Sequence, residues 1–509
     1  MRIHLIQLFE ETVRKYPEKT AVIDKDRCVS FSDVRRKAMQ TATTIALQGL
    51  AQNKPVGVFL DKSVESVYAD LGILYAGDFY MNLDIKTPAE RIKNILQLVE
   101  PAAIISNSIQ IKSIATVIPD SVKLILLDEM DTEMVVDGQM LSKRRSTVID
   151  TDPSCIINTS GSTGTPKGVV LNHKSFFDFL DWSIETFRFG DDLVMGSLSP
   201  IVFDIYSFEL CMLMAKASTL VVLPAHLAAF PAKILEVLEK HQVNFLFWVP
   251  TIMVNIANMD LLSAFKLGSL RTVWFAGEVF PTKQYNYWHH HLPEVVFANL
   301  YGPIEITLDC TYYIINKEIA DSDPLPIGYP CRNTDILILD DDDRLVTEAD
   351  VEGELCVRGT SLAMGYYNNP EKTAASFVQN PLNHSYPETI YRTGDLVFIN
   401  DRGEIVFKGR KDSLIKHMGY RIELGEIEHV IINTLKLVKN GCVVYNHQHK
   451  EITLYYEAES ELTAADFRKS IGNTLPKYMI PVVYHHLPEL KRNTNGKIDR
   501  LYYSKLVEK

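Results

Sequence analysis

The stretch Ser160-Gly161-Ser162-Thr163-Gly164-Thr165-Pro166-Lys167-Gly168 decides the interpretation of this 509-residue chain. It follows Ile156-Ile157-Asn158-Thr159, which has the composition of a strand end. Glycines let backbone N–H groups approach an anion, hydroxyls donate further hydrogen bonds, and Lys167 adds a positive charge. The stretch predicts a polyphosphate-binding loop, with a flexible surface turn as the alternative on composition alone. Its spacing is not that of a Walker A loop, because Pro166 precedes the lysine and no Ser or Thr follows it.

The segments on both sides of this loop alternate between short apolar runs and helical patterns. Residues 63–75 have the pattern of a helix, and the runs typical of buried strands are 56–60, 103–105, 124–127, 220–223 and 245–249. Such alternation predicts a layered α/β fold with much parallel sheet. Because 509 residues exceed what one core usually supports, we expect two or more domains.

The pattern changes after about residue 330, where strands are separated by acidic and glycine-containing turns. The run 340–343 consists of four aspartates, and without the spaced ligands of a calcium loop it predicts a solvated hairpin turn. A break is expected near 409–412, followed by about 100 residues, which suffice for a small α+β domain. We therefore expect a large N-terminal α/β domain over 1–410 and a small C-terminal domain over 411–509.

Composition excludes several classes of protein. The net charge of −12 argues against a nucleic-acid-binding protein, and the seven cysteines include no CxxC pair, which argues against a disulfide framework or a structural zinc site. We see no signal peptide and no apolar run of transmembrane length, so a cytoplasmic protein without membrane insertion is expected. Three adjacent histidines, 289–291, cannot all face one ion in a regular element, so they predict a surface patch.

The loop and six later motifs, in order along the chain, resemble the adenylate-forming superfamily, which contains acyl-CoA synthetases, luciferases and nonribosomal peptide synthetase adenylation domains. The later motifs are Asn299-Leu300-Tyr301-Gly302-Pro303-Ile304-Glu305, Gly353-Glu354-Leu355, Tyr391-Arg392-Thr393-Gly394-Asp395, Gly409-Arg410-Lys411-Asp412, Gly419-Tyr420-Arg421-Ile422-Glu423-Leu424 and Asn495-Gly496-Lys497-Ile498-Asp499-Arg500. The resemblance spans essentially the whole chain. It implies two half-reactions: a carboxylate attacks the α-phosphorus of ATP, and a thiol then attacks the resulting acyl-adenylate and releases AMP.

The resemblance also assigns roles to residues. Lys497 is the catalytic lysine of the first half-reaction, where an ammonium stabilises charge between carboxylate and α-phosphate. Asp395 accepts hydrogen bonds from the ribose hydroxyls, Tyr301 stacks on adenine, and Glu305 holds Mg²⁺. The complete set implied for ATP and AMP is Thr159, Ser160, Gly161, Ser162, Thr163, Gly164, Lys167, Gly277, Glu278, Asn299, Leu300, Tyr301, Gly302, Asp395, Arg410 and Lys497.

Two further positions concern movement between the half-reactions. Asp412 matches the family hinge, about which the mobile small domain rotates, and Gly419 matches the glycine that leaves a tunnel for a phosphopantetheine arm. Ile304 departs from the threonine usual at its position and removes a hydroxyl near the phosphates. That departure keeps open a catalytically weak nucleotide-binding relative.

Asp204 points to the acid that is activated. A carboxylate before an apolar, helix-like segment is costly to bury unless it meets a cation, and in the amino-acid-activating branch the matching aspartate binds the α-ammonium group. A helix N-cap is the structural alternative. The expected substrate pocket consists of Phe203, Asp204, Ile205, Phe208, Phe247, Trp274, Ala276, Leu300, Leu308 and Asp309. Its aromatic residues predict a small amino acid, and Asp309 could meet a hydroxyl, an amine or a second charge.

The run 274–281 resembles stand-alone D-alanine–D-alanyl carrier protein ligases, although Ala276 replaces the cysteine typical of that branch. D-alanine is thus the leading candidate, to be transferred to the phosphopantetheine of a separate carrier protein. An acyl- or aryl-CoA ligase is the alternative. An enzyme of that class would have no role for Asp204.

Overall fold

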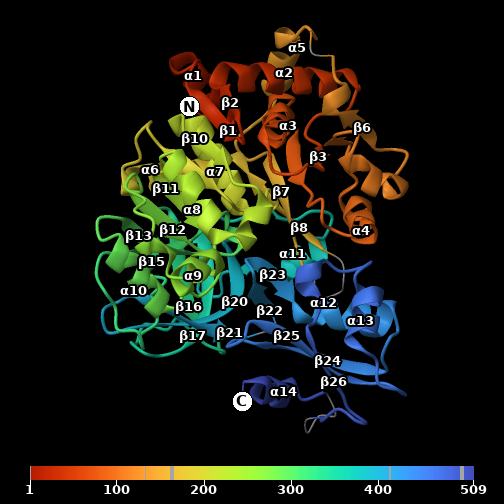
Figure 1. The fold of residues 1–509 in the computed structure, drawn as a ribbon, viewed down its shortest axis with the longest axis vertical. Coiled ribbons are helices and arrows are strands. Elements are labelled where there is room, and N and C mark those ends of the chain that lie inside the picture. Colours follow the sequence, from red (N-terminus) through yellow and green to blue (C-terminus); the bar gives the residue numbers. More distant parts are fainter. Residues whose placement is uncertain (1, 132, 161–165, 412–413, 493–497, 509) are drawn as a thin grey trace.

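The computed structural model describes residues 2–131, 133–160, 166–411, 414–492 and 498–508 (Figure 1). The strands of the first large sheet are β1 (Thr20–Asp24), β2 (Arg27–Ser30), β9 (Val194–Ser197), β10 (Thr219–Val222), β11 (Phe245–Trp248), β12 (Thr272–Phe275), β13 (Val296–Tyr301), β14 (Thr311–Ile315) and β15 (Tyr329–Pro330). They follow the order β15-β14-β13-β12-β11-β9-β10-β1-β2, parallel from β13 to β1. Residues 245–248 are all buried, as expected for a central strand covered on both faces.

A second large sheet carries the predicted phosphate loop. Its strands are β3 (Pro55–Val58), β4 (Phe79–Asn82), β5 (Ala103–Ser106), β6 (Lys123–Leu126), β7 (Pro153–Thr159), β8 (Lys167–Asn172) and β18 (Gly365–Tyr366), in the order β18-β8-β7-β4-β3-β5-β6. β7 and β8 pair antiparallel across residues 160–166, and Thr159 faces Lys167. The described residues at the two ends of the loop therefore lie next to paired strands of this sheet, as the position of the loop after a strand end predicts.

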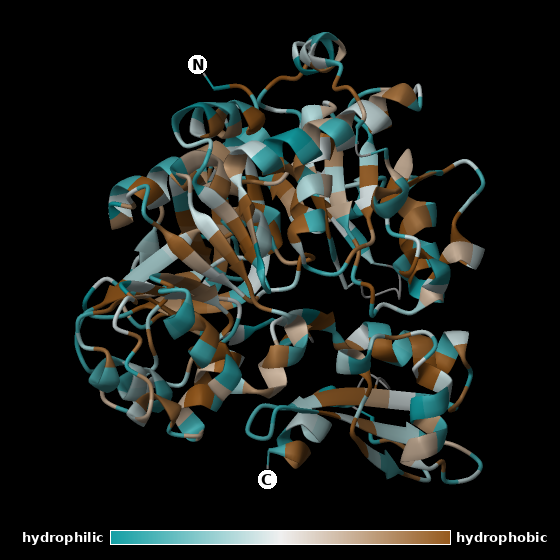
Figure 2. Ribbon diagram, turned by 45° about the horizontal axis from the view of Figure 1, so that its top comes forward, coloured by the Kyte–Doolittle hydropathy of each residue, from teal (hydrophilic) through white to brown (hydrophobic). Residues whose placement is uncertain are grey.

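Helices fill the space between the two sheets and cover their outer faces. The helices before the C-terminal part are α1 (Ile6–Lys15), α2 (Phe31–Leu47), α3 (Val64–Tyr75), α4 (Ala89–Val99), α5 (Gly138–Arg145), α6 (His173–Phe187), α7 (Asp204–Lys216), α8 (Pro231–Lys240), α9 (Pro250–Asn258), α10 (Thr282–His291) and α11 (Pro370–Ser376). One core joins both sheets to α1, α2, α3, α6 and α7, a second packs α8, α9 and α10 on the first sheet, and a third packs α4 on the second. Figure 2 shows hydrophobic residues concentrated along the central strands.

A third, antiparallel sheet follows residue 330. It contains β16 (Thr334–Leu339), β17 (Gly353–Gly359), β19 (Phe377–Gln379), β20 (Thr389–Ile399) and β21 (Ile405–Arg410). The four aspartates 340–343 form the turn after β16, where the Asp340 side chain accepts the N–H groups of Asp342 and Arg344. The prediction of a hairpin turn at this acid run is confirmed.

The C-terminal part has its own core and lies below the large layered part in Figure 1. Its elements are β22 (Leu414–His417), β23 (Tyr420–Glu423), α12 (Leu424–His429), β24 (Asn440–Asn446), β25 (Glu451–Glu457), α13 (Ala464–Ile471), β26 (Val483–His486) and α14 (Arg500–Val507). The prediction of a large layered α/β part followed by a small α+β part is confirmed. The boundary at residue 410 and the mobility of the small part stay predictions.

Candidate active site

A cavity of about 140 Å³ lies where the two large sheets and the C-terminal part meet. From the large part it is lined by residues of the phosphate loop, of the segment before α7 and of the segment after β13. From the C-terminal part, Lys416, Gly419, Tyr420 and Arg421 contribute to the wall. The cavity is lined by residues from Asn82 to Met479, so it joins segments far apart in the sequence. It lies at the carboxyl ends of parallel strands, where α/β proteins commonly bind ligands.

The described part of the phosphate loop presents polar groups to this cavity. Asn158, Thr159 and Ser160 line it, and the side-chain amide of Asn158 and the hydroxyl of Thr159 are buried without a hydrogen-bond partner among the described residues. Buried polar atoms are rarely left unpaired, so this wall suits a polar ligand. Gly161, Ser162, Thr163 and Gly164 lie outside the described residues, and their roles stay predictions.

Strand β23 lies directly against this loop. Lys167 Nζ forms an ion pair with Glu423 Oε1 at 2.6 Å. The hydroxyl of Ser160 donates to the Arg421 carbonyl at 2.7 Å and accepts the Glu423 N–H at 3.0 Å. The Glu423 carboxylate therefore pairs with Lys167, the loop residue whose positive charge the sequence analysis assigns to phosphate.

Glu305, the predicted magnesium ligand, is fully buried and also meets β23. Its Oε1 accepts the Tyr366 hydroxyl at 2.8 Å, and its Oε2 pairs with Arg421 Nη1 at 2.6 Å. The Arg421 charge lowers the pKa of Glu305, although burial opposes this. This carboxylate pairs with a cation, so its chemistry fits the predicted Mg²⁺. Within the described part of the chain, no cluster of three or more His, Cys, Asp or Glu could hold a metal. The three histidines 289–291 form the end of α10.

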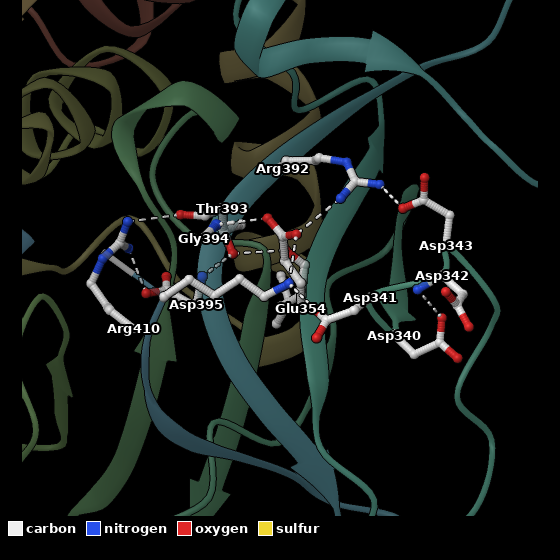
Figure 3. A network of polar contacts seen from close by, with 12 residues as sticks. Asp340, Asp341, Asp342, Asp343, Glu354, Arg392, Thr393, Gly394, Asp395 and Arg410 are labelled. Carbon is white, nitrogen blue, oxygen red and sulfur yellow. Dashed lines mark hydrogen bonds and ion pairs between the residues drawn. The ribbon is translucent and has the colours of Figure 1, made fainter. Parts of the chain in front are cut away.

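The predicted nucleotide side is built on β13, β20 and β21. Figure 3 shows Asp395 beside Arg410, which donates to its Oδ1. The Tyr301 hydroxyl donates to Asp395 Oδ2. Arg410 also donates to the Thr393 carbonyl at 3.0 Å. Asn299 donates to the Pro326 carbonyl at 2.8 Å. The structure thus brings Tyr301, Asp395 and Arg410 into one cluster.

Glu354 joins this cluster to the end of β21. Its Oε1 accepts the Gly394 N–H at 3.1 Å, and its Oε2 lies 3.0 Å from Arg392 and 3.5 Å from Lys411 Nζ (Figure 3). Lys411 also donates its backbone N–H to the Gly394 carbonyl at 2.8 Å. These bonds tie the turn beside Asp395 to the last described residue before the C-terminal elements. The predicted hinge, Asp412, lies outside the described residues.

The predicted ammonium site is the first residue of α7. Asp204 lines the cavity, and burial raises its pKa to about 6. Asp309 is 3% exposed, lines the same cavity, and has a pKa raised well above its usual value by burial and by the charge of Asp204. Lys416 of β22 lines the cavity as well, and burial lowers its pKa. Two acids and one base thus share a small volume.

The predicted side-chain pocket divides into two groups. Phe203, Ile205, Phe247, Ala276 and Leu308 line the cavity with Asp204 and Asp309. Phe208, Trp274 and Leu300 are buried but do not line it. Trp274 packs on Phe247 at 5.4 Å and on Phe208 at 5.2 Å between ring centroids. This second group fills the space behind the wall and keeps the cavity small.

Gly419 and Glu278 meet on another side of the cavity. The Gly419 N–H donates to Glu278 Oε1 at 2.8 Å, while Glu278 Oε2 accepts the Thr251 N–H at 3.1 Å. Gly419 has φ +81°, and a Cβ there would lie 2.9 Å from Val249 and 3.0 Å from Phe203. Gly277 and Gly302 also line the cavity. A Cβ at Gly302 would lie 2.3 Å from the Leu308 carbonyl oxygen. The turns at Gly302 and Gly419 therefore both need glycine.

The predicted catalytic Lys497 lies outside the described residues. Its described neighbours, Arg492 and Ile498, form a bridge within the C-terminal part, and Ile498 packs with Val444 and Tyr503 away from the cavity. Sequence reasoning missed Lys416, Arg421 and Glu423 as site residues. The signal was present, because all three lie beside or within the Gly419 motif.

Comparison with known proteins identifies the family. The model of the AMP-binding enzyme family matches residues 9–367. Tyrocidine synthase 1 of Brevibacillus parabrevis is 31% identical over 97% of this chain, which spans only 44% of that protein. Zwittermicin A synthase ZmaJ of Bacillus cereus is 30% identical, with 97% of this chain and 93% of the relative aligned.

Among solved structures, the adenylation domain AlmE of Vibrio cholerae, in complex with glycyl-adenosine-5′-phosphate, has the same fold. It matches with a TM-score of 0.84 at 20% identity, covering 100% of this chain and 98% of AlmE. No helix among the described residues is long and apolar enough to cross a bilayer. From the matched family model and these relatives, we conclude that this chain belongs to the AMP-binding enzyme family of adenylate-forming ligases.

Proposed function

We propose that this chain uses ATP to activate a small amino acid as its aminoacyl-adenylate and then transfers the aminoacyl group to the phosphopantetheine thiol of a separate carrier protein. The observation that carries the proposal is the half-buried carboxylate of Asp204 on the cavity wall, where desolvation raises its pKa to about 6. A buried carboxylate is stabilised by a cation held within hydrogen-bonding distance, and the α-ammonium group of an amino acid supplies one.

The first half-reaction joins a carboxylate oxygen of the amino acid to the α-phosphorus and releases pyrophosphate. Ser160 and Lys167 would bind the phosphates, and Asp395 with Arg410 would orient the ribose. Glu305 would hold Mg²⁺, which neutralises phosphate charge when bound. We assign to Lys497 the stabilisation of negative charge between the two reacting groups.

The second half-reaction joins the thiol sulfur to the acyl carbon, and AMP leaves with the electron pair of the broken C–O bond. We propose that the part from residue 411 turns about Asp412 between the two steps and that the arrangement described here serves the second one. Two observations support this assignment: Gly419 lines the cavity, and the residues that flank Lys497 pack elsewhere.

The small cavity favours a small side chain, and D-alanine is the leading candidate. Asp309 adds a buried carboxyl group to the cavity, and the methyl side chain of alanine cannot donate a hydrogen bond to it. Serine and 2,3-diaminopropionate, whose side chains carry a hydroxyl or an amine, therefore belong in the substrate panel.

Amino-acid-dependent exchange of pyrophosphate into ATP tests the proposal, with glycine, both alanine enantiomers, serine and 2,3-diaminopropionate as substrates. We expect exchange with at least one of them. Asp204→Asn should raise the KM for that amino acid about a hundredfold, which corresponds to about 3 kcal/mol for the lost charge pair. The KM for ATP should stay within threefold of the wild-type value.

The control is Asp192→Asn, which removes an exposed ion pair with Arg271. Turnover of CoA with an organic acid, and none with any amino acid, would instead establish an acyl- or aryl-CoA ligase. ATP binding without adenylate formation from any acid would establish a nucleotide-binding relative.

A further inference from the structure

A buried carboxyl–amide pair lies behind the cavity wall, between the two large sheets. Asp70 on α3 is fully buried, and Asn82 at the end of β4 is 4% exposed and lines the cavity. Asp70 Oδ2 accepts the Tyr206 hydroxyl at 2.9 Å and Asn82 Nδ2 at 3.4 Å. Asn82 Nδ2 also donates to the Ile201 carbonyl at 3.1 Å.

The remaining oxygens of this pair, Asp70 Oδ1 and Asn82 Oδ1, are both buried and have no hydrogen-bond partner among the described residues. The amide orientation follows from its neighbours, because exchanging its O and N would aim an acceptor at the Ile201 carbonyl and the Asp70 carboxyl. Each residue of this hydrogen-bonded pair thus holds one buried acceptor that lacks a hydrogen. A proton on Asp70 Oδ1, donated to Asn82 Oδ1, would satisfy both and close a cyclic acid–amide pair.

The pair contacts the chain on both sides of Asp204. Through Asn82 it binds the carbonyl of Ile201, three residues before Asp204, and directly it binds the hydroxyl of Tyr206, two residues after it. The same segment turns between these contacts, where the Phe203 N–H donates to the Pro200 carbonyl at 3.0 Å. The position of the Asp204 carboxylate therefore depends on both contacts.

We propose that Asp70 is a positioning residue of the amino-acid site: as a neutral carboxylic acid paired with Asn82, it holds the segment that presents Asp204 to the substrate ammonium. This inference rests on the function proposed above and adds a residue that no sequence motif marks. Loss of the proton leaves two acceptors facing each other, and their repulsion displaces Asn82 from the Ile201 carbonyl.

The surroundings of Asp70 favour the neutral acid near neutral pH. Burial raises its pKa to about 7, which hydrogen bonds from Tyr206 and Asn82 only partly oppose. The titratable groups around it are Tyr80 of β4, Cys155 of β7 and Tyr206, all with pKa values raised by burial. Glu209 and Cys211, both on α7, act on Tyr206 and Tyr80 respectively, and Lys62 lies 5.4 Å from the Tyr206 ring.

Asp204 and Asp70 are expected to change the affinity for the amino acid in opposite directions as the pH rises. Asp204 must be ionised to bind an ammonium group, so affinity for the amino acid rises through pH 6. Asp70 must be protonated to position it, so affinity falls again above about pH 7. The α-ammonium group of the substrate keeps its proton over this pH range, because the neighbouring free carboxylate raises its pKa above the range.

The test is pyrophosphate exchange with the preferred amino acid between pH 5.5 and pH 8.5. For the wild type we expect the amino-acid KM to rise 5- to 10-fold from pH 7 to pH 8.5, with kcat within twofold. Asp70→Asn supplies a neutral N–H in place of the acid O–H, so it should keep the wild-type KM at pH 6.5 and abolish the rise. Asp70→Leu, which cannot form the pair, should raise KM at every pH.

The matched control is Asp78→Asn. Asp78 is another buried acid near the start of β4, with a pKa raised to about 6, but it contacts Arg144 and the Lys54 N–H rather than the site. This variant should retain the alkaline rise in KM. An unchanged rise in Asp70→Asn, or its loss in Asp78→Asn, would overturn the positioning role.

Infrared spectroscopy tests the acid–amide pair without turnover. The difference between wild type and Asp70→Asn should contain the carbonyl band of a protonated carboxylic acid at pH 6, and the band should vanish at pH 8.5. Its absence at pH 6 would refute the pair. A wild type that activates no amino acid would instead refute the proposed function, and with it the positioning role, while the infrared result would stand on its own.

Discussion

Gly419 lines the cavity, and a methyl group added at this residue would test the thioester-transfer half-reaction. Gly419→Ala would place its Cβ 2.9 Å from Val249 and 3.0 Å from Phe203, and φ +81° adds backbone strain. We expect thioester transfer to fall at least tenfold while pyrophosphate exchange stays within threefold. Gly403→Ala is the control, because φ is +75° there and nothing lies within 4 Å, so it reports strain alone. Equal losses in both half-reactions would contradict the tunnel at Gly419.

Asp204 gives a second prediction at the scale of the residue. Burial raises its pKa to about 6, so the neutral acid predominates below that pH and the ammonium-binding charge develops above it. We expect kcat/KM for the amino acid to rise about tenfold from pH 5 to pH 7, before the fall that the titration of Asp70 predicts at higher pH. Asp204→Asn should remove this acid limb, and Asp192→Asn should retain it. An identical limb in Asp204→Asn would assign the titration to another group.

Sequence reasoning reaches single residues when their neighbours in the chain define the role. The loop at 160–168 and the turn at Asp395 are local motifs, and their described residues do lie in or beside the site. Asp70 and Asn82 are 12 residues apart on different elements and have no motif. The sequence analysis expects Trp274 in the pocket, but whether a strand residue touches a cavity or fills the layer behind it depends on packing across three elements.

At the scale of the element, strand β23 supplies charges to a site built by other parts of the chain. Arg421 pairs with the fully buried Glu305, and removing the arginine costs about 3–5 kcal/mol, because the glutamate charge stays buried and unpaired. The cost applies only while β23 lies in the site. We therefore expect Arg421→Met to slow thioester transfer about a hundredfold, measured by transfer from enzyme-bound adenylate, while adenylate formation stays within fivefold.

Arg358→Met is the control for this prediction, since Arg358 belongs to β17 and pairs with Asp335 and Glu388 away from the cavity. A comparable loss of adenylate formation in Arg421→Met would show that this arginine serves the first half-reaction. The sequence analysis marks residues 419–424 as a motif by resemblance and predicts no strand there. Its contact with the phosphate loop could not, because the loop and the strand are more than 250 residues apart.

At the scale of the whole molecule, the cavity is closed by two parts with separate cores. Lys416, Gly419, Tyr420 and Arg421 all come from the C-terminal part, so a fragment of residues 1–410 would leave the site open to water on that side. We expect this fragment to fold, because its cores contain no residue beyond 407, and to form adenylate at least a thousandfold more slowly.

The measurement is single-turnover adenylate formation, with circular dichroism as the check of folding. Adding residues 411–509 as a second polypeptide should restore part of the rate. Adenylate formation by the fragment within tenfold of the intact chain would contradict the assignment of Lys497. A fragment that fails to fold would contradict the boundary at residue 410.

The pairing of β23 with the phosphate loop also bears on how easily the molecule changes state. Arg421 brings a positive charge to Glu305, as a metal ion does, and Glu423 brings a negative charge to Lys167, as a phosphate does. If the small part rotates as proposed, it would replace the departing metal and pyrophosphate with groups of the same signs. The rotation would then exchange equivalent ionic partners, so we expect a small free-energy difference between the two arrangements. A modest change in product concentration should then suffice to reverse the rotation.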